Sequence, residues 1–456
     1  MTTNVEEARI PRRRIITWGL WNWGADAYNI VILTFVFSVY MVSSYFVDPA
    51  IVEAYNQAGG AKGTGPAKVA FDAATTHLTS DFSLVITISA IVLAVLAPVI
   101  GQSADRGGRR KLWLGIYTGL MLVTCFMLFF VQGQPSFFWL GAMLIGAGGI
   151  FYELASVNYN AMLVQVSTPK NIGRVSGFGW GMGYLGGIVL LLVSLVGFIL
   201  GDGPYLFGVT SDNGMNIRVI AILVAVWCLI FTVPVLFTVP ENAAIAPGKR
   251  LSPIGAYASV GRSIGRLFRN DRQTFNFMLA SMVFRDGLAA VFTFGGILAA
   301  TVFGFEKTEV ILFAVAANVI AGIGVFIGGA LDDKLGAKTV IVGALITMSV
   351  AGIAMFFLHA EGKLAFWICG LLLCLCVGPA QSSSRSLMAR LAPQGNEGEI
   401  FGLYAMTGKA TIFIGSAMFY AFVTAFGATY WGILGIIIVI LAGLFLLLPV
   451  KVGGKR

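Results

Sequence analysis

Charged residues are scarce in this sequence of 456 residues. Asp, Glu, Lys and Arg make up 11% of the chain, whereas hydrophobic residues make up 57%, and the mean hydropathy is +0.86. So few charges cannot cover the surface of a soluble domain of this length. The sequence therefore predicts an all-α membrane protein, because a helix satisfies its own backbone hydrogen bonds in lipid.

Histidine and cysteine are also scarce. The two histidines, His77 and His359, and the five cysteines show no metal-ligand spacing. The sequence contains no phosphate-binding glycine loop and no arrangement typical of a catalytic nucleophile. We therefore expect no metal, no cofactor and no enzymatic activity, and we expect a gradient to supply any energy that the protein uses.

Long apolar runs are abundant. Crossing a hydrocarbon core of about 30 Å takes about 20 helical residues. Runs of sufficient length lie near 16–44, 83–103, 112–132, 137–160, 175–200, 217–239, 274–303, 309–330, 338–358, 364–386, 400–426 and 429–449. They predict about twelve transmembrane helices in two six-helix halves, 1–239 and 273–456, joined by a linker at 240–272. The Gly- and Ala-rich residues 47–80 are expected to form an outer loop.

The basic residues are distributed unevenly between the two sides. If both termini are cytoplasmic, 22 of the 30 Lys and Arg residues fall in cytoplasmic segments and five in outer loops. This asymmetry is the positive-inside pattern. We therefore expect a multi-pass protein of the cell inner membrane with cytoplasmic termini, and we interpret the net charge of +9 as a topology signal that requires no nucleic acid partner.

The linker carries three arginines at helical spacing. Arg262, Arg266 and Arg269 alternate with apolar residues, as in an amphipathic helix that lies on an anionic membrane surface. An ordinary solvated linker helix explains the same pattern, and both interpretations remain open.

A short motif occurs in both halves. The segment GQSADRGGRRK at 101–111 aligns with GGALDDKLGAK at 328–338, so that Asp105 matches Asp333 at an offset of half the chain. Two matches at equivalent places indicate a duplicated unit whose halves are related by a two-fold axis along the membrane normal. The first copy resembles the signature loop of the major facilitator superfamily, and this resemblance implies a gating role at the membrane surface for the charged residues of both copies, Asp105, Arg106, Arg109, Arg110, Asp333 and Lys334.

This loop resembles the signature of the major facilitator superfamily, G-x-x-x-D-R/K-x-G-R/x-R/K. Further segments resemble the vacuole-effluxer-like branch, which includes a fungal autophagy-related vacuolar amino-acid exporter. They are WGLWNWGADAYNIVILTFVFSVYM, YNAML, SGFGWGMGYLGG, FRDGLAAVFTFGG, QSSSRSLMARLAP and EIFGLYAMTGKA. The resemblance implies the major facilitator fold and secondary transport. The sequence departs from the branch at Asn22, where an acid is common, and at Asp26, where small or polar residues are common. Members of the branch also carry an acid-bearing segment after YNAML, and in this chain Val164 and Gln165 replace it.

Six charged residues fall inside the predicted spans. A charge at mid-bilayer costs roughly 2.5–3.5 kcal/mol on insertion scales, so it usually has a partner or a function. In the facilitator fold implied by the resemblance, the helices that carry five of the six line a central cavity. Asp26 and Asp286 are expected at similar depth, facing each other across the two-fold axis, where reversible protonation would suit them. The residues are Asp26, Glu153, Arg285, Asp286, Arg385 and Lys409.

Structural roles remain open for these charges. Ion pairs could lock helices together, Arg385 could pack in a gate, and Lys409 would then need a buried acid nearby. Neutral polar residues extend the candidate cavity lining, although any one of them could instead form an interhelical hydrogen bond. They are Asn22, Tyr28, Tyr152, Asn158, Asn318 and Gln381.

The functional hypothesis is a secondary active transporter that moves a small polar or charged solute by alternating access. Proton coupling and a monomeric state are expected, and the resemblance favours amino acids as solutes. The expected partners are the solute, protons and the lipid bilayer. Two alternatives remain: an exporter of amphipathic drugs or lipids, which predicts an apolar cavity, and a transport-inactive receptor or assembly factor, which predicts dependence on the loops.

Overall fold

A computed structural model describes residues 10–60, 65–201, 204–241, 253–411 and 413–451. In these residues the regular secondary structure is helical, with no strand. The described residues contain eleven helices that are long and apolar enough to cross a membrane, and the shorter apolar helix Trp431–Leu447 follows them. The prediction of an all-α protein with about twelve membrane helices is confirmed.

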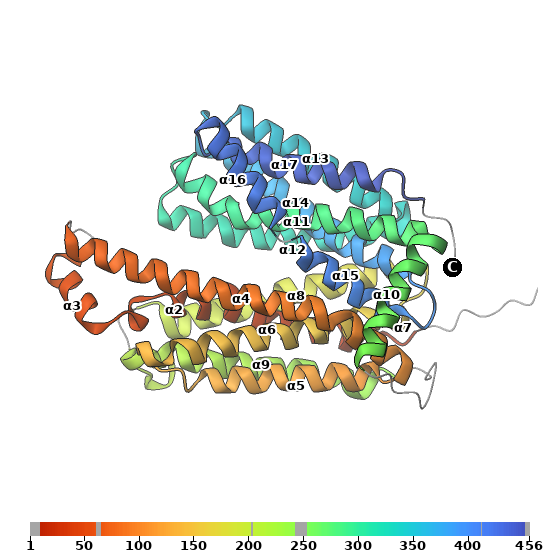
Figure 1. The fold of residues 1–456 in the computed structure, drawn as a ribbon, viewed down its shortest axis with the longest axis horizontal. Coiled ribbons are helices and arrows are strands. Elements are labelled where there is room, and N and C mark those ends of the chain that lie inside the picture. Colours follow the sequence, from red (N-terminus) through yellow and green to blue (C-terminus); the bar gives the residue numbers. More distant parts are fainter. Residues whose placement is uncertain (1–9, 61–64, 202–203, 242–252, 412, 452–456) are drawn as a thin grey trace, which may run out of the picture.

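The first six spans occupy one side of the molecule, coloured red to yellow-green in Figure 1. Their elements are α1 (Arg12–Ala27) with a π-helix (Tyr28–Phe35) and α2 (Phe37–Met41), α4 (Pro66–Gly107), α5 (Arg110–Leu128), α6 (Phe138–Ala161), α8 (Ile172–Ser194) with a π-helix (Leu195–Ile199), and α9 (Met215–Thr238). The short helices α3 (Pro49–Gln57) and α7 (Leu163–Val166) connect spans.

The last six spans form the other side, coloured green to blue in Figure 1. Helix α10 (Pro253–Asn270) lies in the linker, and its three arginines are exposed. The spans are α11 (Arg272–Thr301), α12 (Lys307–Leu335), α13 (Ala337–Phe357), α14 (Lys363–Leu391), α15 (Glu397–Ala410) followed by α16 (Ile414–Phe426), and α17 (Trp431–Leu447).

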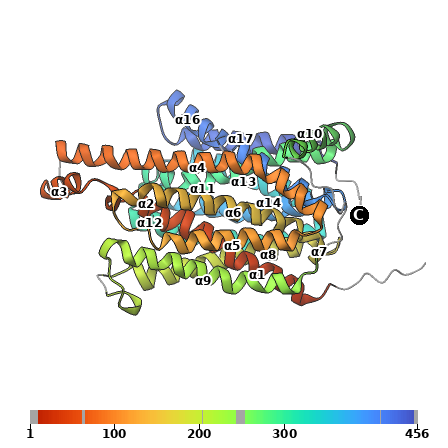
Figure 2. The same ribbon diagram turned by 60° about the horizontal axis from the view of Figure 1, so that its bottom comes forward.

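Both ends of the described chain lie at the same end of the helix bundle, on the right in Figures 1 and 2. We call this the terminal end and the opposite one the α3 end. At the terminal end, α10 lies across the bundle axis in contact with α4 and α11, so that it touches both sides of the molecule.

The expected outer loop at 47–80 is wrong for much of its length. Asp48 caps α3 by accepting a hydrogen bond from the Ala50 N–H at 2.8 Å, and a proline follows at the first helical position. Helix α4 begins at Pro66, well before the apolar run, because the Ala-rich residues that follow are good helix formers. Tyr55 of α3 stacks on Phe71 of α4 with ring centroids 4.0 Å apart.

Three spans that were predicted as continuous helices depart from a single α-helix; in the fifth, a π-helix (Leu195–Ile199) forms the end of the span. In the first span, α-helix gives way to π-helix directly after Ala27, next to Asp26, and the chain bends at Val36. The eleventh span is divided between α15 and α16, and Thr411 at its break has φ −110° and ψ 1°. Such interruptions are frequent at functional sites and in the membrane helices of transporters.

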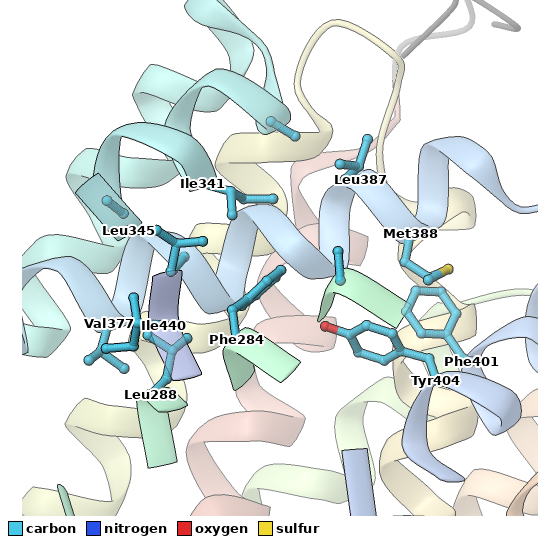
Figure 3. Packing of buried hydrophobic residues seen from close by; sticks show 14 of the residues in the cluster. Phe284, Leu288, Ile341, Leu345, Val377, Leu387, Met388, Phe401, Tyr404 and Ile440 are labelled. Atoms are coloured by element: carbon cyan, nitrogen blue, oxygen red, sulfur yellow. The ribbon is translucent and has the colours of Figure 1, made fainter. Parts of the chain in front are cut away.

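Side-chain packing within the second half is shown in Figure 3. Phe284 and Leu288 of α11 lie beside Ile440 of α17, and all three are fully buried. A Cβ at Gly443 would meet the backbone of Phe284, so a glycine there lets two helices approach closely. Large apolar side chains are conversely exposed around the bundle, including Phe357 at 73%, as expected for a surface that faces lipid.

Candidate functional site

The signature-loop carboxylate of the first half binds a helix of the second half. Asp105, near the end of α4, accepts hydrogen bonds from the N–H groups of Gly398 at 3.0 Å and Glu399 at 2.7 Å, in the first turn of α15. Unpaired N–H groups make a helix N-terminus attractive to an anion. Asp105 therefore ties the two halves together at the terminal end.

The second copy repeats this arrangement in the opposite direction. Asp333 of α12 accepts hydrogen bonds from the N–H groups of Gly173 at 2.8 Å and Arg174 at 3.1 Å, at the start of α8 in the first half. Each half thus contributes one carboxylate that caps a helix of the other half. This reciprocity is the structural counterpart of the repeat found in the sequence.

The basic residues of the motif differ in their surroundings. Arg110 is buried and pairs with Asp105 at 2.5 Å and with Glu397 of the second half at 2.7 Å. Arg106 donates to Ser259 of the linker helix α10 at 3.2 Å. Arg109 and Lys334 are exposed, and no described residue forms an ion pair with either of them.

Glycine allows the two halves to meet backbone to backbone at this end. A Cβ on Gly177 of α8 would lie 2.8 Å from the carbonyl oxygen of Val325, and one on Gly329 of α12 would lie 2.8 Å from that of Gly173. On the other side of the bundle, a Cβ on Gly101 of α4 would overlap the backbone of Gly398. Contacts this close leave no room for larger residues.

Arg385 of α14 crosses into the first half and is 3% exposed. Its guanidinium donates to Oγ of Ser176 at 3.0 Å, to the Ser176 carbonyl oxygen, and to Oδ1 of Asn160 at 3.1 Å. The same group lies over three aromatic rings of the first half, at 5.2 Å from Trp18, 5.7 Å from Tyr159 and 5.5 Å from Trp180. The structure therefore places Arg385 in the contact between the halves.

Further along the bundle, one ion pair joins the two halves. Nζ of Lys409 in α15 lies 2.9 Å from Oε1 of Glu153 in α6, and the two side chains are 29% and 30% exposed. Glu153 is thus an acid near Lys409, but it is half-buried, whereas a structural role for Lys409 was expected to require a buried acid. Among the described residues, every hydrogen bond or ion pair between the halves lies at this pair or on its terminal side.

Asp26 adjoins this pair within the first half. Its carboxylate accepts a hydrogen bond from the hydroxyl of Tyr152, the residue before Glu153, and the charges of Glu153 and Arg385 act on it. A Cβ on Gly183 of α8 would collide with the carboxylate, so a glycine is needed where α8 passes. Asp26 therefore has a fixed position beside the ion pair, with 8% exposure.

The equivalent charges of the second half have other contacts. Arg285 lies over the ring of Tyr404 at 4.0 Å and donates to the carbonyl oxygen of that residue at 3.2 Å. Asp286 accepts a hydrogen bond from the Gly415 N–H at 2.5 Å, at the start of α16. The two acids differ in their contacts, because Asp286 caps the helix that begins after the break whereas Asp26 bonds to Tyr152. That they face each other at similar depth stays a prediction.

Most of the neutral polar candidates form hydrogen bonds to the backbone; those of Asn22 and Tyr28 join two helices, as the structural alternative expected, whereas those of Asn158 and Asn318 stay within one helix. Asn22 donates to Gly179, Tyr28 to Ile145, Asn158 to Leu154, and Asn318 to Ala314, at 2.7–2.9 Å. Gln381 is half-buried, with no recorded hydrogen bond to a described side chain or backbone group. Among the hydrogen bonds of the described residues, the bond from Tyr152 to Asp26 is the one that joins a neutral candidate to a charged candidate.

A separate apolar cavity lies inside the second half. Its volume is about 40 Å³, and it is lined by residues that include Leu298, Phe313, Met355, Phe366 and Ile437. This space is large enough for a few water molecules and is lined by none of the charged residues. In the described part of the chain, no group of three or more His, Cys, Asp or Glu side chains is placed to hold a metal ion.

The sequence matches the family described as "Vacuole effluxer Atg22 like" over residues 11–456. The chain belongs to this Atg22-like family. A similar relative is the uncharacterized MFS-type transporter YxiO of Bacillus subtilis, which is 27% identical over 94% of this chain and 93% of its own length. Autophagy-related protein 22-1 of Neosartorya fischeri is 26% identical over 54% of this chain and 42% of its own length.

Solved structures of major facilitator transporters share the fold of this Atg22-like chain. The human organic anion transporter MFSD10 superposes with a TM-score of 0.68 at 14% identity, covering 96% of this chain and all of that one. The proton:xylose symporter XylE gives a TM-score of 0.67 at 14% identity, covering 95% and 94%. The predicted major facilitator fold is confirmed, and the chain is a multi-pass membrane protein of a transporter family.

Sequence reasoning missed several residues that contact the candidates. Trp18, Tyr159 and Trp180 surround Arg385, and Tyr404 lies under Arg285. All four are aromatic residues in segments that carry the family resemblance, but no charge or motif marked them. Their role follows from a tertiary contact with a cation on another helix.

Proposed function

We propose that this protein is a secondary active transporter that carries a small polar or charged solute by alternating access, coupled to protons. The observation that carries the proposal is the Glu153–Lys409 ion pair, which joins the two halves beside Asp26. An acid from one half and a base from the other provide charges that a solute can take over. Exchange of this pair for contacts with the solute would link binding to movement of the halves.

The placement of the contacts between the halves supports alternating access. Carboxylate caps, glycine contacts and the Arg385 contact all lie at the terminal end. If the positive-inside pattern assigns this end to the cytoplasm, the structure is closed towards the cytoplasm. Transport then requires these contacts to break and others to form at the α3 end.

The charges on the two sides favour a solute that carries both signs. Asp26 and Glu153 belong to the first half, and Lys409 and Arg285 belong to the second. An amino group would bind the acids and a carboxylate would bind the bases, with charge-assisted hydrogen bonds to each. Amino acids meet this requirement, in keeping with the resemblance to an amino-acid exporter. An exporter of amphipathic drugs would instead need an apolar chamber here.

Asp26 is the proposed proton carrier. It is a buried carboxyl that has a tyrosine hydroxyl as its hydrogen-bond donor and a second acid, Glu153, next to it. A group in this setting can alternate between protonated and ionised forms as Lys409 engages or leaves Glu153. Asp286 is assigned a structural role instead, because it caps α16.

The test measures the uptake of radiolabelled amino acids into proteoliposomes made from inner-membrane lipids, with and without a pH gradient. The wild type should accumulate solute only with the gradient. Asp26→Asn should lose gradient-driven accumulation but keep solute exchange at equal pH, whereas Glu153→Gln should lose both by at least tenfold. Asp72→Asn, on the exposed outer part of α4, is the matched control and should behave as the wild type.

Two results would contradict the proposal. Gradient-driven accumulation that survives Asp26→Asn would exclude Asp26 as the proton carrier. Uptake that survives Glu153→Gln at wild-type rates would separate the ion pair from transport altogether.

A further inference from the structure

The environment of Arg385 is unusual for a buried cation. Its guanidinium is enclosed by three aromatic rings, and among the described residues no carboxylate forms an ion pair with it. Its hydrogen bonds all go to neutral oxygens of Ser176 and Asn160. Ring faces and neutral acceptors together form a site suited to a cation that carries N–H groups.

The aromatic cage, defined as Trp18, Tyr159 and Trp180, belongs entirely to the first half. Trp18 stacks on Tyr159 with centroids 4.3 Å apart, and its indole N–H donates to the Tyr159 carbonyl oxygen at 3.1 Å. Trp21 also stacks on Tyr159, with ring centroids 4.5 Å apart. These contacts hold Trp18 and Tyr159 together without Arg385, which enters from α14 of the second half, and Trp180 of α8 packs against Tyr184 of the same helix with ring centroids 6.2 Å apart.

The cage continues a line of candidate site residues towards the terminal end. Trp18, Asn22 and Asp26 follow one another at intervals of four on α1, so they share one helix face. On α6, Tyr159 lies two turns beyond Tyr152, which binds Asp26. At about 1.5 Å per residue, the cage lies about 12 Å from Asp26 along the bundle.

We propose that the aromatic cage is a second binding site for a cationic group, an ammonium or guanidinium, of the transported solute. In the present conformation Arg385 occupies this site. When the halves separate at the terminal end, Arg385 leaves with α14 and the cage faces the path between Asp26 and the open end. The cage then holds the cationic group of a solute on that side of the membrane. This inference rests on the proposed transport function.

Arg385 on this account is a built-in competitor for the cage. Arg385 occupies the cage when the terminal end is closed, so the solute cannot bind there. A solute cation bound in the cage would oppose closure until it dissociates. Because Ser176 and Asn160 accept hydrogen bonds there, the cage should prefer a cation with N–H donors to a neutral molecule of the same shape. Guanidinium and urea are such a pair of probes.

The first test measures binding of radiolabelled guanidinium, with urea as the neutral control, to purified full-length protein in lipid nanodiscs. In Arg385→Ala the cage is vacant, so guanidinium should bind at one site at least tenfold more tightly than in the wild type, and urea should not bind. Arg385→Lys should resemble the wild type because the lysine keeps a cation in the cage. Arg385→Ala combined with Trp180→Leu should lose the gained binding. Thermal unfolding of each variant, with and without guanidinium, shows that it is folded and gives a second readout.

The second test asks whether solute uses the cage. In the otherwise wild-type protein, Trp180→Leu should weaken the apparent affinity for a cationic or zwitterionic solute at least fivefold when solute is presented at the terminal end, and leave it unchanged at the α3 end. Trp139→Leu, an exposed tryptophan of α6, is the matched control.

Either of two results overturns the inference. One is guanidinium binding to Arg385→Ala that is no tighter than in the wild type or no tighter than urea binding. The other is an effect of Trp180→Leu that is equal on both sides. Both can occur while Asp26→Asn and Glu153→Gln behave as expected, so failure of the cage is distinguishable from failure of the transport proposal.

Discussion

The ion pair between Glu153 and Lys409 offers a quantitative prediction. Two unit charges about 3 Å apart attract by roughly 5 kcal/mol at an effective dielectric constant of about 20. Their side chains are 30% and 29% exposed, so solvent weakens this gross attraction. Exposed pairs contribute about 1 kcal/mol or less, and loss of one partner from a buried pair costs about 3–5 kcal/mol. We therefore expect the ion pair to stabilise the closed terminal end by about 2 kcal/mol, a value between these limits. This free energy corresponds to a factor of about 30 in the closed-to-open ratio.

This pair joins the halves, so its loss should favour opening of the terminal end. Lys409→Met and Glu153→Gln should each shift the closed-to-open ratio about 30-fold towards open, and the double variant should shift it no further than either single one. The charge swap Glu153→Lys with Lys409→Glu should restore closure. Distances between spin labels on exposed Ser103 of α4 and Gln394 before α15, measured in nanodiscs, report the ratio.

Controls make this prediction refutable. Lys451→Met removes one positive charge at the terminal end without touching the contact between the halves and should leave the label distances unchanged. If Lys409→Met also leaves them unchanged, or if the effects of the two single variants simply add, the pair does not hold the halves together.

Two further predictions concern a glycine contact and a helix cap. Gly177→Ala or Gly329→Ala should hold the terminal end open and abolish transport while the protein stays folded. Label distances measure the opening, and thermal unfolding shows that the variants are folded. The control is Gly343→Ala, because a Cβ at Gly343 meets nothing within 4 Å. Asp286→Ala should lower the free energy of unfolding by about 1–2 kcal/mol in denaturant titrations, because the Gly415 N–H loses its acceptor, whereas Asp286→Asn should keep most of the stability and gradient-driven uptake. Loss of proton coupling in a stable Asp286→Asn variant would contradict the structural role.

The fold was largely predictable from the sequence because membrane helices follow from local composition. The apolar runs located the spans, and the offset between Asp105 and Asp333 revealed the repeat. The contacts of these two carboxylates with Gly398 and Gly173 could not be predicted, because they depend on how the halves meet. The same holds for α4, whose Ala-rich beginning is helical but too polar to be recognised as part of a span.

The candidate site was predictable in its members but not in its pairings. Intramembrane charge singled out Glu153, Lys409, Asp26 and Asp286, since each is expensive to leave without a partner in lipid. Symmetry then led to the expectation that Asp286 would mirror Asp26. The structure gives the two acids different partners, because the break in the eleventh span creates a helix N-terminus that Asp286 caps. No pattern in the apolar sequence of that span predicts the break.

The most direct test of the account measures distances at both ends of the molecule in one lipid preparation. One label pair is placed at Ser103 and Gln394 at the terminal end, and another at Ser136 and Glu361 at the α3 end, all of which are exposed. Alternating access predicts that Lys409→Met lengthens the first distance and shortens the second. A variant in which the first distance lengthens while the second stays unchanged, or in which neither changes, would contradict it.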